Sequence, residues 1–240
     1  MTDLLNINQQ GDTWTFTLNR SAKMNALSAL MVEALISGVE SAHNAGARLL
    51  IFDGAGKNFC AGFDFSDIDS QSDGDLLLRF IRIETLLQCI DSSPCLTVSF
   101  AHGKNFGAGV DLFAVCKQRY CSAEASFRMP GLKFGLVLGS RRFSDLVGRA
   151  MALQILQEAQ SISATQAKDI GLVTSIAEVA GWQSIVGDAQ RVARSLPVQA
   201  QRQLYKVLDS HWSDKDMADL VRSAAAPGLR NRIKDYIGAN

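Results

Sequence analysis

Residues 96–111 of the chain, LTVSFAHGKNFGAGVD, decide which fold the sequence predicts. Residues 96–100, Leu-Thr-Val-Ser-Phe, indicate a buried strand. Gly103, Gly107 and Gly109 follow this run, and small residues let a backbone approach a ligand closely. A helix that starts at Gly107 would direct unpaired N–H groups outward. The stretch therefore predicts a strand, a glycine-rich turn and a helix start in direct succession.

The same order occurs once more upstream, where the apolar run 49–52 is followed by the turn Phe59-Cys60-Ala61-Gly62-Phe63-Asp64-Phe65. Backbone donors from two such turns would converge on one developing negative charge, the arrangement called an oxyanion hole. A plainer interpretation is that the glycines only form tight turns, because a single glycine motif is a weak signal.

The rest of the chain predicts an α/β core followed by helices. Residues 13–18 alternate polar and apolar side chains, so they indicate a half-buried strand that pairs with 4–8 across Gly11-Asp12. Helical spacing from Ser28 to a cap at Gly46, and again over 75–90, implies crossover units and a largely parallel sheet. We expect an α/β core over 1–180 and a helical region over 181–240. The later elements predicted are a strand at 172–176 and helices at 182–195, 198–210, 214–224 and 229–237.

Composition excludes several classes of protein. Lys plus Arg and Asp plus Glu number 24 each, so the 240-residue chain lacks the basic excess of a nucleic-acid or membrane-surface binder. No secretory signal and no apolar run of about 20 residues is present. Five cysteines without a CxxC pair predict reduced thiols in a cytoplasmic protein, and three scattered histidines predict no metal site.

Four segments in this order resemble the crotonase (enoyl-CoA hydratase/isomerase) superfamily. The match covers most of the chain. The segments are Asn19-Arg20-Ser21-Ala22-Lys23-Met24-Asn25-Ala26-Leu27, Lys57 through Asp64, Gly103 through Asp111, and Ile162 through Val173, the last similar to the family's "SA…A…GLV" segment.

The resemblance implies a spiral of ββα turns with a helical trimerisation region, so a homotrimer or a dimer of trimers. It implies an acyl-CoA substrate, no further cofactor and a role in fatty acid metabolism. The thioester oxygen would be held by the amides of Phe63 and Ala108, and a thioester enolate would be stabilised there. The positions implied to bind substrate or coenzyme A are Lys23, Ala26, Ala61, Gly62, Phe63, Asp64, Phe65, Ala108 and Arg141.

The chain departs from the family at both catalytic acids. Family hydratases use two glutamates, since water addition needs one group for the water and another for the α-carbon proton. Asp111 holds the first position, and the second falls on Gly131, which has no ionisable side chain. We therefore expect isomerase or lyase chemistry in which Asp111 moves a proton. Asp111 could instead only stabilise a helix dipole, and His102 could be a base or a core histidine.

Gly139-Ser140-Arg141-Arg142 is a third departure, because the family shows small residues at the acyl end of its pocket. A guanidinium that pointed inward would match a substrate carboxylate, which suggests a carboxyacyl-CoA decarboxylase or hydrolase. The alternative is that Arg141 and Arg142 lie at a solvated helix start or a subunit contact. A catalytically silent acyl-CoA binder is the third possible function.

Overall fold

The computed structural model describes residues 4–208 and 213–239. Strands β1 (Leu5–Gln10) and β2 (Thr13–Leu18) form the predicted antiparallel hairpin, with Leu5 opposite Leu18. Four further strands extend this sheet in the order β1-β2-β3-β4-β6-β9, and every pair after the hairpin is parallel. They are β3 (Leu49–Gly54), β4 (Leu96–Ala101), β6 (Gln118–Cys121) and β9 (Ser175–Ile176). A second sheet holds β5 (Lys104–Phe106), β7 (Ser126–Arg128) and β8 (Ser161–Ser163).

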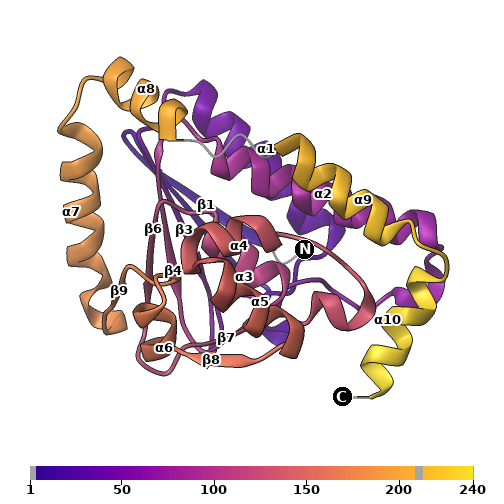
Figure 1. Ribbon diagram of the computed structural model, residues 1–240. Coiled ribbons are helices and arrows are strands. Elements are labelled where there is room, and N and C mark those ends of the chain that lie inside the picture. The colour runs from indigo at the N-terminus through magenta and orange to yellow at the C-terminus, as the bar shows by residue number, and fades with distance from the viewer. Residues whose placement is uncertain (1–3, 209–212, 240) are drawn as a thin grey trace.

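Both faces of the larger sheet are covered, which explains why the first four residues of β3 and all six of β4 are buried. Leu50 and Phe52 face the main core, into which α1 (Ala29–Asn44) and α2 (Asp73–Asp91) also pack. Leu49 and Ile51 face a second cluster closed by Ala189 and Ala193 of α7 (Trp182–Arg194). Figure 1 shows α7 on one side of the sheet and α1 and α2 on the other.

Of the remaining helices, α8 lies near α7, where its Tyr205 packs on the second cluster, and the others lie around the smaller sheet and α2. Helix α9 runs along α2, and the C-terminal helix α10 lies at the far end of the molecule from α7 (Figure 1). These helices are α3 (Ala108–Ala114), α4 (Ser140–Val147), α5 (Arg149–Glu158), α6 (Ala164–Asp169), α8 (Val198–Leu208), α9 (Ser213–Ala224) and α10 (Leu229–Gly238). Short 3₁₀ turns occupy Ser21–Lys23, Ile68–Ser70, Gly131–Phe134 and Val179–Gly181.

Two sequence predictions differ from the structure. The expected strand at 172–176 is only the two-residue β9, because Leu172 and Val173 are core side chains and the Val173 amide bonds to Ala167. The helices α4, α5 and α6 and the strands β5, β6, β7 and β8 were not predicted. The last two residues of the predicted helix 198–210 lie outside the described residues. Within the described chain, no helix combines the length and apolarity needed to cross a bilayer.

Candidate active site

Two glycine-rich turns meet in the structure as the sequence predicted. Gly62 has φ +81°, and a Cβ on it would lie 2.3 Å from the Phe106 carbonyl oxygen and 3.1 Å from the Ala108 nitrogen. A Cβ on Gly109 would likewise lie 2.3 Å from the Cys60 carbonyl oxygen. Glycine is thus required at both places, because the two backbones touch where a side chain would stand. This contact brings the turn at Phe63 next to the first residue of α3, Ala108.

Phe63 and Ala108 both line a cavity of about 580 Å³. Neither amide is a donor in the backbone hydrogen bonds of the described turns and loops, in which Leu27 donates to Gly62 and Gly107 donates to Arg128. Two buried amides without a backbone acceptor can both donate to one oxygen of a ligand. Two converging donors of this kind are what an oxyanion hole requires.

Asp64 fixes the first turn. Its Oδ2 atom lies 2.5 Å from Arg20 Nη1, and its Oδ1 atom accepts bonds from the amide and hydroxyl of Ser66 at 3.0 and 2.7 Å. Burial alone would raise the pKa of Asp64, but the bonds from Ser66 and Arg20 lower it below its usual value. Asp64 is thus ionised and fixes the conformation of the first turn, although it also lines the cavity.

The segment before the first turn is held by Asn25, which the sequence analysis did not single out. Met24 and Asn25 both have positive φ, 48° and 55°, a conformation that non-glycine residues seldom adopt. Asn25 Nδ2 donates to the carbonyls of Ala55 and Asn58 at 2.9 and 2.8 Å, and Oδ1 accepts from the Arg20 amide. These three bonds fix the segment that places Lys23 and Ala26 at the cavity.

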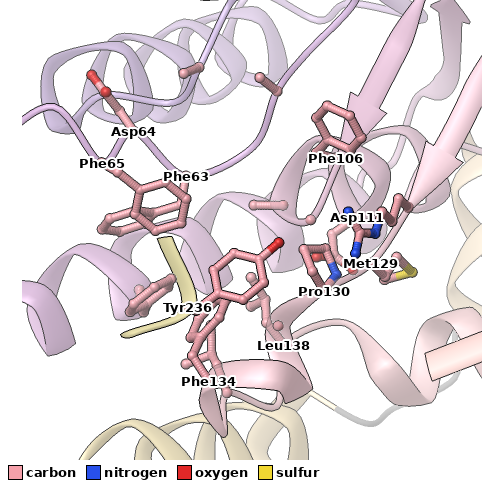
Figure 2. Close-up of a pocket in the computed structure, with 18 of the residues that line it drawn as sticks. Phe63, Asp64, Phe65, Phe106, Asp111, Met129, Pro130, Phe134, Leu138 and Tyr236 are labelled. Carbon is pink, nitrogen blue, oxygen red and sulfur yellow. The ribbon is translucent and has the colours of Figure 1, made fainter. Parts of the chain in front are cut away.

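Figure 2 shows the cavity with Asp111 on one side, Phe63 and Phe65 on the other, and Tyr236 between them in this view. Of the residues expected to bind substrate, Lys23, Ala26, Ala61, Phe63, Asp64, Phe65 and Ala108 line it. Gly62 lies behind the wall, where its carbonyl accepts from Leu27. The wall away from the turns is mostly apolar, formed by Ile68, Phe80, Met129, Leu132, Phe134, Leu136, Leu138, Leu156 and Ile237.

Asp111 is buried on α3, one helical turn beyond Ala108, and lines the same cavity. Its Oδ1 atom has no hydrogen-bond partner among the described residues. Gly139 packs directly against it, since a Cβ there would lie 1.8 Å from that oxygen. Burial raises the pKa of Asp111 well above its usual range, with Arg142 opposing the effect and Glu84 adding to it. An acid of this kind gives up its proton at a higher pH than an exposed aspartate does.

Asp111→Asn is expected to stabilise the fold, by an amount that grows with pH. The folded pKa of Asp111 is raised, so ionisation costs stability as pH rises from the unfolded value of 3.8 through the folded pKa. Asparagine cannot ionise and avoids that cost. Thermal unfolding should show a Tm gain of roughly 2–4 °C at neutral pH, the effect of about 1 kcal/mol in a chain of this size. The gain should vanish below about pH 4, and a gain that is constant with pH would contradict the assignment.

Arg141, expected at the substrate, is not among the described residues that line the cavity. Its guanidinium pairs with Asp216, and with Asp219 Oδ2 at 2.7 Å. Arg142 is buried and pairs with Glu84 of α2. Neither guanidinium is directed to a substrate carboxylate, because carboxylates of the protein already occupy both. The acidic partners lie 58 to 78 residues away in the chain, so no local sequence signal could have identified them.

Gly131 lines the cavity. It is the residue that the sequence analysis placed where family hydratases carry their second acid. His102 does not line the cavity; its Nε2 atom lies 3.0 Å from the Gly56 carbonyl oxygen, and its ring contacts Trp182. Tyr236 and Ile237, which sequence analysis also missed, bring α10 over the cavity. Their only sequence signal was that the helix 229–237 carries apolar residues.

Comparisons with known proteins point to one family. The sequence profile of the family described as Enoyl-CoA hydratase/isomerase matches residues 9–225. The "Probable enoyl-CoA hydratase echA6" of Mycobacterium bovis is 31% identical over 234 residues, covering 90% of this chain and 93% of its own. The peroxisomal Delta(3,5)-Delta(2,4)-dienoyl-CoA isomerase of Arabidopsis thaliana is 27% identical, covering 72% and 68%. A chain from Bordetella parapertussis, assigned as an enoyl-CoA hydratase/isomerase, superposes with a TM-score of 0.97 at 54% identity over 98% of both chains.

Proposed function

The chain belongs to the enoyl-CoA hydratase/isomerase (crotonase) family, and from that premise we propose that it moves protons on acyl-CoA thioesters through an enolate. The amides of Phe63 and Ala108 would bind the thioester oxygen and stabilise its developing charge. Asp111 would remove the α-proton and return it to the γ-carbon, which shifts a double bond. The observation that supports this most is the buried Asp111 carboxyl, one turn from the Ala108 amide in a single cavity.

Isomerisation or a related lyase step fits this site better than hydration does. One acid that gives back the proton it has taken is enough to move a double bond, whereas hydration needs a second group to activate water. Asp111 and Asp64 are the carboxylates among the described cavity-lining residues, and Asp64 is occupied by Arg20 and Ser66. A dienoyl-CoA isomerase among the relatives is consistent with such chemistry.

Incubation with 3-enoyl-CoA thioesters, followed by chromatography, tests the proposal. We expect conversion to the 2-enoyl isomer for at least one acyl group that fits the apolar wall. If acyl-CoA binds but no thioester changes, the catalytically silent binder is the better account. The carboxyacyl-CoA decarboxylase or hydrolase has no support from Arg141 or Arg142, since both are paired within the protein.

Coenzyme A thioesters are expected to bind in the micromolar range, about −8 kcal/mol. Lys23 lines the cavity, and Lys57 precedes the first turn. Their ammonium groups would meet the phosphates, so Lys23→Ala and Lys57→Ala should each weaken binding, and more so at low salt. Calorimetry with acetyl-CoA and crotonyl-CoA measures this. No heat and no thermal shift at millimolar ligand would be incompatible with an acyl-CoA site.

A homotrimer or a dimer of trimers is also proposed, with residues 181–240 as the helical region that mediates it. Helix α8 exposes apolar side chains that the single chain does not cover, Val207 at 77% and Leu208 at 72% exposure. Light scattering at micromolar concentration should give three or six times the 26.0 kDa chain mass. A monomer mass would refute this assembly.

The five unpaired cysteines are the basis for placing the protein in the cytoplasm.

A further inference from the structure

A buried ion pair joins α2 and α4, and neither of its members lines the cavity. Glu84 of α2 is fully buried and binds Arg142 of α4 through both guanidinium Nη atoms, one at 3.2 Å from Oε2. Gln88 also donates to Glu84 Oε1 at 2.8 Å. Burying two charges requires loss of their hydration, and apolar side chains of similar size often pack as stably. Stability alone is therefore a weak reason for this pair to be here.

Gly139 is the structural link between Arg142 and Asp111. Gly139 caps the N-terminus of α4 and touches Asp111 Oδ1, and Arg142 follows one helical turn later. Arg142 favours the charged form of Asp111 and Glu84 disfavours it. Asp111 Oδ1 has no hydrogen bond within the described protein. No hydrogen bond to this oxygen therefore competes with nearby charges in their effect on its ionisation.

The described elements that pack on α3 carry other charged groups, of which Asp73, Asp75, Arg79 and Arg82 of α2 and Asp145 of α4 are partly or fully exposed. Helix α3 has no second ionisable residue, β4 has none, and β5 contributes only Lys104, which is exposed. Asp216 of α9 and Asp91 of α2 each lie 3.4 Å from the Arg142 guanidinium, and Arg141 is directed to Asp216 and Asp219. From the cavity side, Lys23, Asp64 and Arg128 complete the charged lining.

We propose that Arg142 and Glu84 are positioning residues whose opposed charges set how readily the Asp111 carboxyl gives up and accepts a proton. Neither residue lines the cavity, so each acts through Asp111. Only the catalytic use of this effect rests on the proposed function. The effect on Asp111 itself is a property of the folded protein and is measurable without turnover.

The two members of the pair have opposite effects, which separates this role from a structural one. Glu84→Gln removes a negative charge in nearly the same shape, so Asp111 should lose its proton at lower pH. Arg142→Gln removes the favourable positive charge and leaves the carboxylate of Glu84 without its partner, so Asp111 should lose its proton at higher pH. Loss of packing or of stability has no reason to move the two variants in opposite directions.

Infrared difference spectroscopy against pH measures the protonation of Asp111 directly. The C=O band of its protonated carboxyl is identified as the band that Asp111→Asn removes. The midpoint should move by roughly half a pH unit or more, downward in Glu84→Gln and upward in Arg142→Gln. Arg141→Gln is the matched control and should leave the midpoint unchanged, as should the charge-conserving Arg142→Lys.

The same variants are then assayed for proton exchange as a function of pH, where the acid limb should follow the infrared midpoint. Shifts in the same direction, or no shift in Glu84→Gln, would overturn the inference. Glu84→Gln decides the matter if Arg142→Gln does not fold, because its change in shape is minimal. Infrared shifts in a protein that exchanges no thioester proton would keep the inference and defeat the proposed function instead.

Discussion

Asp111→Asn is expected to slow proton exchange on a bound acyl-CoA by about 10²-fold or more. Asparagine keeps the shape of the side chain against Gly139 but cannot accept a proton. The Phe63 and Ala108 amides are untouched, so affinity for coenzyme A thioesters should hold. Exchange into the α- or γ-carbon, measured by mass spectrometry with binding measured by calorimetry, separates the two effects.

His102→Gln is the matched control for this experiment. His102 is the other base considered from the sequence, but it bonds to Gly56 and packs on Trp182 outside the cavity. Its replacement should leave exchange near the parental rate. If Asp111→Asn exchanges protons as fast as the parent, the base is another group or a bound water. Asp111 would then be only a buried residue of the α3 N-terminus.

Hydration of crotonyl-CoA is expected to be about 10²–10⁴-fold slower than in a family member with two glutamates. Gly131 stands in the cavity wall where a second acid is needed, and it cannot orient or deprotonate water. The loss of enoyl-thioester absorbance measures this rate. Turnover in the ordinary hydratase range would show that the loop at Gly131 plays a different role.

Gly131→Glu offers the reverse test. Gly131 is not among the residues with positive φ, and a Cβ there would lie 3.2 Å from the Leu136 carbonyl oxygen. A side chain is therefore conformationally allowed if that carbonyl moves by a few tenths of an ångström. The variant should gain hydration activity relative to the parent, while Gly131→Gln, of equal size but without an acid, should not.

Local patterns predicted the parts of the fold whose determinants are local. The runs at 49–52 and 96–100 became β3 and β4 because each is buried on both faces. Helix α4 lies between Gly139 and Gly148 and buries mainly Arg142 and Phe143, so it shows no apolar stripe to detect. Strand β8, at Ser161–Ser163, exists only through its pairing with β7.

The site residues, too, could be predicted only where their determinants are local. Glycines at the ends of apolar runs predicted the two turns, since close backbone contact leaves a direct mark on sequence. The direction of Arg141 and Arg142 could not be predicted, because it depends on Glu84, Asp216 and Asp219 in other helices. The burial of Asp111, and with it the raised pKa, also depends on packing between α2, α3 and α4.

The most direct measurement of the central claim is incubation of the parent protein with a panel of acyl-CoAs in heavy water, followed by mass spectrometry. Enolate formation through Asp111 predicts deuterium at the α- or γ-carbon of at least one thioester with an apolar acyl group, even without net turnover. It also predicts none in samples without protein. Tight binding of the same thioesters with no deuterium in any of them would contradict the account and leave a silent acyl-CoA binder.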